Sequence, residues 1–193
     1  IIIATGSYPL AGPESIPEDM TVEVRDLLAL EELPQNLVVW GNGPHAIELA
    51  QFAKLAGKNV TIATTENNIL PETDTFLSLY TQKFLKKSKI DVYYSAKIKE
   101  AKPGEFTIET IKDQEDTKPV EVTIPCDRVI NASNRFGIIP ETGLPIDRDS
   151  TGRFIQVNDH LQTTVDGIFA IGDVNGRSIF AHAASAQGLY VIN

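Results

Sequence analysis

Cysteine, methionine and tryptophan are almost missing from this sequence, since its 193 residues contain one of each. The single cysteine, Cys126, excludes an internal disulfide, a paired-cysteine redox motif and a cysteine-based zinc cluster within the chain. We expect this thiol to be an unreactive core group, because no nearby residue would lower its pKa. The lone His45 and His160 lack metal-ligand partners, so no metal site is expected.

Positive charge and long apolar runs are scarce as well. The chain has 17 basic against 26 acidic side chains and a net charge of −9, which argues against a nucleic-acid or anionic membrane surface as a partner. It has no apolar run of about 18 residues and no opening signal-peptide pattern. We therefore expect a soluble, cytoplasmic protein with neither nucleic-acid nor membrane partners.

Strand and helix signals alternate along the middle of the chain. An apolar strand at 37–40 precedes a glycine turn, a helix over 44–55 that begins with proline, and a strand at 59–63. Such a strand–helix–strand unit must be parallel and right-handed. Polar and apolar residues then alternate in three further stretches, which predicts an antiparallel meander: 97–102, 105–111 and 120–124. These signals predict an α/β fold.

Several other elements are predicted outside this unit. Two helices are expected over 25–32 and 74–87, and a last one from about residue 180. In the helix over 74–87, apolar residues recur at three- and four-residue spacing, which predicts its buried face: Phe76, Leu77, Tyr80, Phe84 and Leu85. Strands are expected at 1–6, 91–94, 127–132, 154–157 and 168–171. The sequence thus begins within a strand and stops within a helix, so we expect a segment of a longer protein.

The glycine turn carries the strongest functional signal. Gly41 permits a tight turn, and Gly43 lets backbone N–H groups approach a pyrophosphate at the start of the following helix. Because the turn follows a strand and opens a helix, it predicts a Rossmann-like dinucleotide site. A glycine turn without a ligand is the alternative. The candidate ligands here are Gly41, Asn42, Gly43, Pro44 and His45.

The choice of nucleotide should be made at the end of the next strand. An acidic residue there would bind the ribose of NAD, whereas a basic one would suit the 2′-phosphate of NADP. The chain offers Thr64, Thr65 and then Glu66, and it has no Lys or Arg between Lys58 and Lys83. These residues favour NAD. Glu66 lies two residues late and can serve only if the loop folds back.

Three separated blocks of sequence, in the same order, resemble a known family. They are Ala4–Ser7, 37–48 and 161–174, the last followed by a small-residue block at 181–188. This combination resembles the flavin-dependent pyridine nucleotide–disulfide oxidoreductases, the family of dihydrolipoamide dehydrogenase, glutathione reductase and mercuric reductase. The segment 27–34 is most similar to dihydrolipoamide dehydrogenase.

The resemblance implies a division of the chain into domains. Residues 1–11 would end a first FAD-domain segment, 12–140 would form the NAD(P)-binding domain, and 141–193 would resume the FAD domain. Asp173 would bind the flavin ribityl chain and Glu48 the nicotinamide carboxamide, although a turn cap and a solvated helix residue are the plain alternatives. Further positions implied are Asn134 for NAD(P) and Thr5, Gly6, Gly172, Ala181 and His182 for FAD.

The same resemblance implies how the parent enzyme would work. A nicotinamide dinucleotide would exchange hydride with FAD, while the redox cysteine pair and a dimerisation domain with a catalytic His and Glu would lie outside this sequence. No catalytic residue is therefore expected within the chain, and the chain alone should be inactive. Four departures from the family pattern, at Trp40, Asn42, His45 and Asn134, support an alternative: a non-catalytic nucleotide-binding or interaction module with a degenerate site.

Overall fold

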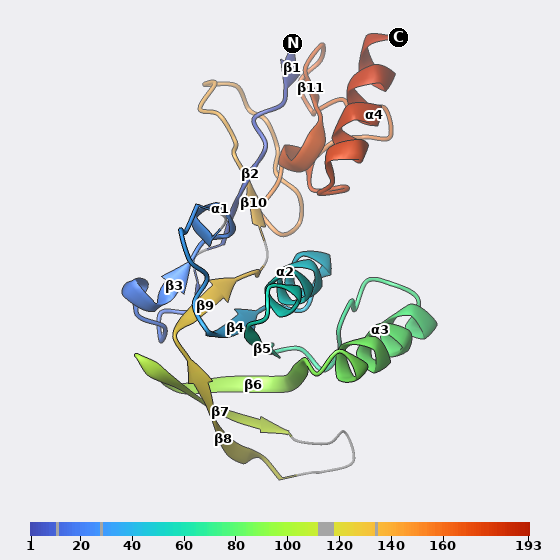
Figure 1. The fold of residues 1–193 in the computed structure, drawn as a ribbon. Coiled ribbons are helices and arrows are strands. Elements are labelled where there is room, and N and C mark those ends of the chain that lie inside the picture. The colour runs from blue at the N-terminus through green and yellow to red at the C-terminus, as the bar shows by residue number, and fades with distance from the viewer. Residues whose placement is uncertain (11, 28, 112–117, 134) are drawn as a thin grey trace. The chain divides into compact units, whose positions relative to one another are not determined.

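The chain folds into two compact units. The computed structural model describes residues 1–10, 12–27, 29–111, 118–133 and 135–193 (Figure 1). One unit, here called the central unit, comprises Ala11–Ser133; the other, the split unit, comprises Ile1–Leu10 together with Asn134–Asn193. Each unit is described by itself.

The central unit contains a seven-stranded sheet with the strand order β3-β9-β4-β5-β6-β7-β8. Parallel pairing joins β3, β9, β4, β5 and the start of β6, and antiparallel pairing joins β6, β7 and β8. The predicted α/β fold, with a parallel sheet and an antiparallel meander, is therefore confirmed. The strands are β3 Thr21–Val22, β4 Asn36–Trp40, β5 Asn59–Ala63, β6 Asp91–Lys102, β7 Gly104–Ile111, β8 Val120–Cys126 and β9 Arg128–Asn131.

Strand β6 belongs to both parts of this sheet (Figure 1). Its first residues pair in parallel with β5, Asp91 opposite Thr61 and Tyr93 opposite Ala63. The register then shifts between Tyr94 and Lys97, and the remainder pairs in antiparallel fashion with β7. The two strands predicted at 91–94 and 97–102 are thus one bent strand, because a bulge lets a strand change direction without ending.

The helices of the central unit begin where local sequence signals place them. Helix α2, Pro44–Leu55, carries proline in its first turn as predicted. Helix α3, Thr75–Lys87, is capped by Asp74, whose Oδ1 accepts a hydrogen bond from the N–H of Phe76 at 2.8 Å. The helix predicted over 25–32 is shorter: α1 covers Val24–Leu27, after a 3-10 turn at Glu18–Met20.

Alternate residues of β4 build two cores on opposite faces of the sheet. Leu37 and Val39 belong to a buried cluster that includes Ala46 and Ala50 of α2. Val38 and Trp40 point the other way, into a cluster formed with the meander. There the Trp40 ring meets Phe106 edge-on, with centroids 6.2 Å apart. Strand β4 is therefore covered on both faces, which explains its continuous apolar sequence.

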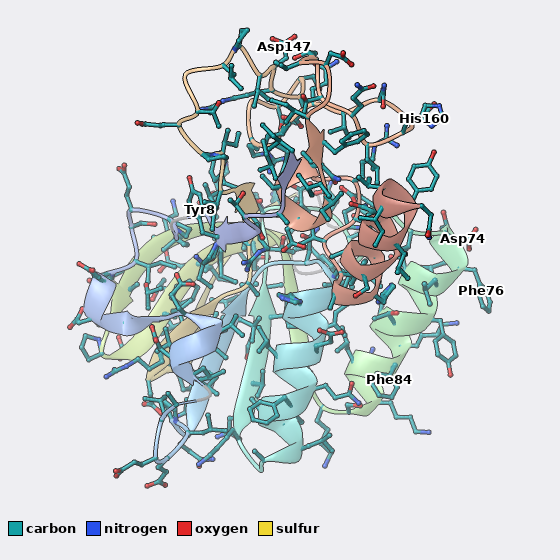
Figure 2. The ribbon with its side chains drawn as sticks, turned by 90° about the horizontal axis from the view of Figure 1, so that it is seen from above. Tyr8, Asp74, Phe76, Phe84, Asp147 and His160 are labelled. Atoms are coloured by element: carbon teal, nitrogen blue, oxygen red, sulfur yellow. The ribbon has the colours of Figure 1, made fainter. Side chains whose placement is uncertain are left out.

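The predicted buried face of α3 is mostly wrong. Leu85 is fully buried, but Phe76 and Tyr80 are 76% and 62% exposed, and Phe76 projects outward in Figure 2. The side chain buried beside Leu85 is Ser78, whose hydroxyl donates to the carbonyl oxygen of Ile69 at 2.5 Å. This bond satisfies a buried polar group and fixes the rotation of the helix, so the apolar stripe turns outward.

The split unit is built from two short strand pairs and one helix. Strand β1, Ile2–Ile3, pairs in parallel with β11, Phe169–Ala170, and β2, Ser7–Pro9, pairs antiparallel with β10, Arg135–Gly137. A 3-10 turn, η2 at Gly172–Asn175, leads to helix α4, Ala181–Ile192. Its small core consists of Ile3, Ile155, Ile168, Ala170 and Val174.

The strand predicted at 154–157 is wrong. Only an isolated bridge joins Ile155 to Arg148. The N–H of Ile155 donates to Val174, whereas the N–H of Gln156 donates to Asp147. Because successive residues bond to different segments, no ladder forms, although Ile155 itself is buried in the core.

Candidate functional site

Gly41 is required by the fold itself. It follows β4, its N–H donates to the carbonyl oxygen of Ala63 at 3.0 Å, and its φ is +150°. A Cβ at this position would collide with the backbone carbonyl of Ala132. The chain after β9 therefore passes too close for any side chain here, and this glycine is explained without a ligand.

Gly43 is different, because nothing in the protein demands a glycine there. Its φ is −81°, and an added Cβ would meet no atom within 4 Å. It is the N-cap of α2 and offers no side chain to the helix N–H groups, although Ser, Thr, Asp or Asn would cap better. The position thus keeps open space in front of a helix N-terminus, which is the space that a diphosphate needs.

The first turn of α2 presents backbone donors to this space. Among the described residues, the N–H groups of Gly43, His45 and Ala46 have no hydrogen-bond acceptor. Pro44 has no N–H to offer, and its ring fixes the first helical turn. Together with the partial positive charge of a helix N-terminus, these donors favour an anion. The local geometry of the turn therefore fits a dinucleotide diphosphate.

The substituted side chains around the turn leave that space clear. Trp40 is 7% exposed and packs into the meander-side core against Phe106. His45 is exposed on the helix surface, where its Nδ1 lies 3.5 Å from Glu48 Oε2. With the two side chains 52% and 69% exposed, this pair contributes little stability. Glu48 thus sits on the exposed face of α2, one turn beyond the glycines.

The loop after β5 folds back to the glycine turn. Asn42 supplies both contacts: its carbonyl oxygen accepts from the N–H of Leu70 at 2.9 Å, and its Nδ2 donates to the carbonyl oxygen of Asn68 at 3.2 Å. The structure therefore brings Asn42 and the residues after Thr64 together at the carboxyl ends of two neighbouring parallel strands. Asn134, the remaining predicted NAD(P) residue, lies outside the described residues.

Thr64 and Thr65 have different environments in this loop. Thr64 is buried, with its N–H bonded to the carbonyl oxygen of Tyr93, and its hydroxyl oxygen accepts the N–H of Glu66 at 3.1 Å. Thr65 and Glu66 are exposed. Reasoning from sequence missed Asn68 and Ser95, which hold the loop, because these contacts join segments far apart in sequence.

The predicted FAD residues all lie in the split unit. The hydroxyl of Thr5 donates to the carbonyl oxygen of Ile138, and the carbonyl oxygen of Gly6 accepts the N–H of the same residue. Gly172 has a φ of +72°, and an added Cβ there would approach Ala184 of α4 to 3.2 Å. Its N–H donates to Gln187 Oε1 at 2.7 Å. These contacts hold η2 against α4 and fix the backbone on either side of Asp173.

Asp173 has a defined set of partners. Its Oδ2 accepts from the Ser7 hydroxyl at 2.6 Å, and that hydroxyl oxygen accepts from Arg135 Nε at 2.7 Å. A second Arg135 bond, from Nη2 to the carbonyl oxygen of Ser7, completes the arrangement at 2.9 Å. Among the described residues, Oδ1 of Asp173 has no partner, so an oriented acceptor remains for a ligand hydroxyl. Ser7 was missed as a site residue, although it ends the first resembling block.

Ala181 and His182 open helix α4 and are exposed. The imidazole of His182 stacks on Phe180, with ring centroids 5.4 Å apart. Helix α4, all of whose residues are described, has no buried side chain. Its first turn is therefore accessible, and so is most of its apolar surface.

Cys126 is the buried thiol that the sequence predicts. Burial raises the pKa of this thiol to about 12, and its Sγ donates to the carbonyl oxygen of Arg128 at 3.3 Å. The group is therefore protonated near neutral pH and is a poor nucleophile. Within the described ranges, no three His, Cys, Asp or Glu side chains gather as a metal site. No described helix has the length and apolarity to cross a membrane.

Comparison with known proteins connects these two units to one family. The model of the pyridine nucleotide-disulphide oxidoreductase family matches residues 1–188. Two similar relatives are dihydrolipoyl dehydrogenases: one from Rhizobium etli is 33% identical and one from Acholeplasma laidlawii is 31% identical, each over the whole of this chain. The chain spans 40% and 56% of their respective lengths.

Solved structures give the same fold. The chain matches the HOCl-induced flavoprotein disulfide reductase RclA of Escherichia coli with a TM-score of 0.78 at 23% identity, covering 99% of this chain and 43% of that one. It matches LpdA of Mycobacterium tuberculosis with a TM-score of 0.79 at 21% identity, covering 99% and 41%. With a family model that covers nearly every residue, the chain belongs to the pyridine nucleotide-disulphide oxidoreductases, a family of enzymes that includes the dihydrolipoyl dehydrogenases.

Proposed function

We propose that the central unit binds the nicotinamide dinucleotide that exchanges hydride with FAD in a dihydrolipoamide dehydrogenase-like flavoenzyme. The observation that carries this proposal is the contrast between the two glycines of the turn. Gly41 is demanded by packing, whereas Gly43 leaves open space before uncapped helix N–H groups. A diphosphate bound at this helix start accounts for a glycine that the fold does not need.

We propose further that the split unit is part of the FAD-binding domain. The pairing of β10 with β2 supports a boundary at 133/134 rather than at residue 140, because Arg135–Gly137 is hydrogen-bonded to Ser7–Pro9. In this proposal the NAD(P)-binding domain is Ala11–Ser133, and the FAD-domain segments are Ile1–Leu10 and Asn134–Asn193.

The proposed roles of the side chains follow from their contacts. When bound, nicotinamide and flavin supply the hydride chemistry, and the protein supplies binding and orientation. Backbone N–H groups at the start of α2 hold the diphosphate, and Glu48 on the exposed face of that helix accepts from the carboxamide. Asp173 presents Oδ1 to a hydroxyl of the flavin ribityl chain, while Ser7 and Arg135 hold its other oxygen.

The chain alone should bind dinucleotide without turnover. Its single thiol is buried and protonated, so it has no group to exchange with a disulfide. Apolar side chains of α4 are exposed, with Leu189 at 61% and Ile192 at 69%. These surfaces support packing against further parts of a larger enzyme, which we propose to be the rest of the FAD domain and a dimerisation domain.

Trp40 provides the test, because it is the only tryptophan and directly precedes Gly41. Titration with NADH should quench Trp40 emission and sensitise nicotinamide emission by energy transfer. Gly43→Val should abolish both changes without lowering thermal stability, since its side chain would enter open space. Leu55→Val, at the exposed far end of α2, is the control and should bind like the unmodified chain.

The same titration can overturn the proposal. Absence of quenching and of energy transfer at millimolar NADH would mean that the substituted turn no longer holds a dinucleotide. That result would favour the second candidate, a non-catalytic interaction module, for which Asn42 is the specific observation: its side chain is used to hold the neighbouring loop.

A further inference from the structure

The loop between β5 and α3, residues 64–74, is held in its folded-back shape from several sides. At the glycine turn, Asn42 accepts the N–H of Leu70 and donates to the carbonyl oxygen of Asn68. Between these contacts, Ile69 is fully buried in the core, and its carbonyl oxygen accepts the Ser78 hydroxyl. The second half of the loop is therefore fixed by both packing and hydrogen bonds.

The first half of the loop is held by the bulge of β6. The N–H of Ser95 donates to the carbonyl oxygen of Glu66 at 3.0 Å, and its hydroxyl donates to Asn67 Oδ1 at 2.5 Å. With its own N–H bonded to Thr64 Oγ1, Glu66 is fixed at both of its backbone polar groups. Only its side chain remains free to point toward solvent.

Backbone strain marks the same contacts. Leu70 and Ser95 have φ values of +53° and +48°, a left-handed conformation that non-glycine residues seldom adopt. Such conformations persist only where surrounding contacts enforce them, and they are concentrated at functional sites. Two of the four described non-glycine residues of this kind hold this one loop.

From these contacts we infer that Asn42 is a positioning residue that fixes the Glu66 loop, so that the Glu66 carboxylate meets the adenosine ribose of the dinucleotide and selects NAD over NADP. This inference rests on the proposed function. A carboxylate accepts the two ribose hydroxyls of NAD and repels a 2′-phosphate. No Lys or Arg lies between residues 58 and 83 to offset that repulsion.

The chemistry of an asparagine suits this task. Its backbone carbonyl can hold Leu70 whatever the side chain is, but only an amide donor of this length holds the Asn68 carbonyl. Asn42→Asp keeps the size and loses the donor, so it should behave like Asn42→Ala. Loss of one hydrogen bond changes an equilibrium by about 2- to 12-fold.

The test compares NADH and NADPH affinities by Trp40 quenching, together with amide hydrogen exchange of the ligand-free chain. The unmodified chain should prefer NADH, and Glu66→Gln should reduce the NADH/NADPH preference by about 10-fold or more. Asn42→Ala and Asn42→Asp should reduce it by about 2- to 12-fold and speed exchange at Glu66 and Leu70. General destabilisation would instead weaken both nucleotides equally.

Asn59→Ala is the matched control, because Asn59 bonds to Asn36 at the opposite end of β5 and should leave the preference unchanged. If Asn42→Ala leaves both the preference and the exchange rates unaltered while NADH still binds, the role of Asn42 is refuted and the proposed function stands. An equal preference for the two nucleotides in the unmodified chain would refute the role of Glu66. No binding of either nucleotide would refute the proposed function and this inference together.

Discussion

The central unit and the split unit differ in how completely they enclose their apolar residues. In the central unit, both faces of β4 are buried, one under α2 and the other under the meander. The split unit has one small core, and its longest element, α4, buries no side chain. Burial supplies most of the stability of a fold, so the central unit should hold most of the folding free energy.

The largest expected effect tests this difference directly. Phe106 is fully buried in the central unit, so Phe106→Ala should lower the free energy of unfolding by about 3–5 kcal/mol through cavity formation. Leu189→Ala on α4 should change it by less than about 0.5 kcal/mol, because that side chain is 61% exposed. Urea unfolding followed by Trp40 fluorescence measures both. Equal losses would show that the two units unfold as one and remove the distinction.

Helix α3 sharpens the comparison, since it belongs to the central unit and yet exposes apolar residues. Leu85→Ala should destabilise the chain by about 2–5 kcal/mol, because Leu85 is fully buried. Phe76→Ala, one helix face away, should stay within about 0.5 kcal/mol. A large loss from Phe76→Ala would mean that the outer face of α3 is covered in solution.

The two glycines of the turn separate folding from binding inside the central unit. Gly41→Ala should destabilise by about 1–3 kcal/mol, because its φ of +150° and the nearby Ala132 carbonyl oppose a side chain. Gly43→Ala should leave the melting temperature unchanged and weaken NADH binding. Calorimetric melting and NADH titration of both variants provide the measurement. The opposite pattern would place the open space at the wrong glycine.

The thiol of Cys126 reports on the central unit alone. Burial holds its pKa at about 12, above the ordinary value of 9.0, so the unfolded chain releases its proton first as the pH rises. The stability due to this group is intact below about pH 9 and falls toward pH 12 with a slope of up to about 1.4 kcal/mol per pH unit. Cys126→Ala should flatten that slope in urea melts between these pH values. An unchanged slope would show that Cys126 does not cause it.

Local signals predicted the glycine turn and its flanking elements well. The proline at the start of α2, the glycines before it and the apolar strands on each side act over a few residues, and β5 and α2 have the predicted bounds. Trp40 reads as an unusual residue in sequence, but its alternation with Val39 already directs it to the face opposite α2.

Long-range bonds explain what sequence could not predict. The rotation of α3 depends on the bond between Ser78 and Ile69, while apolar periodicity pointed to the opposite face. The folded-back loop depends on Asn42 and Ser95, which lie far from Glu66 in sequence. In the split unit, the pairing of Ser7 with Asp173 joins residues 166 positions apart.

The distribution of fixings around the β5–α3 loop has a consequence for protein engineering. Its holding groups come from the glycine turn, from the bulge of β6 and from inside α3, through Asn42, Ser95 and Ser78. A loop grafted from a homologue without its three remote anchors would lose its shape, however suitable its own residues were. Redesign of this edge of the protein has to exchange the anchors along with the loop.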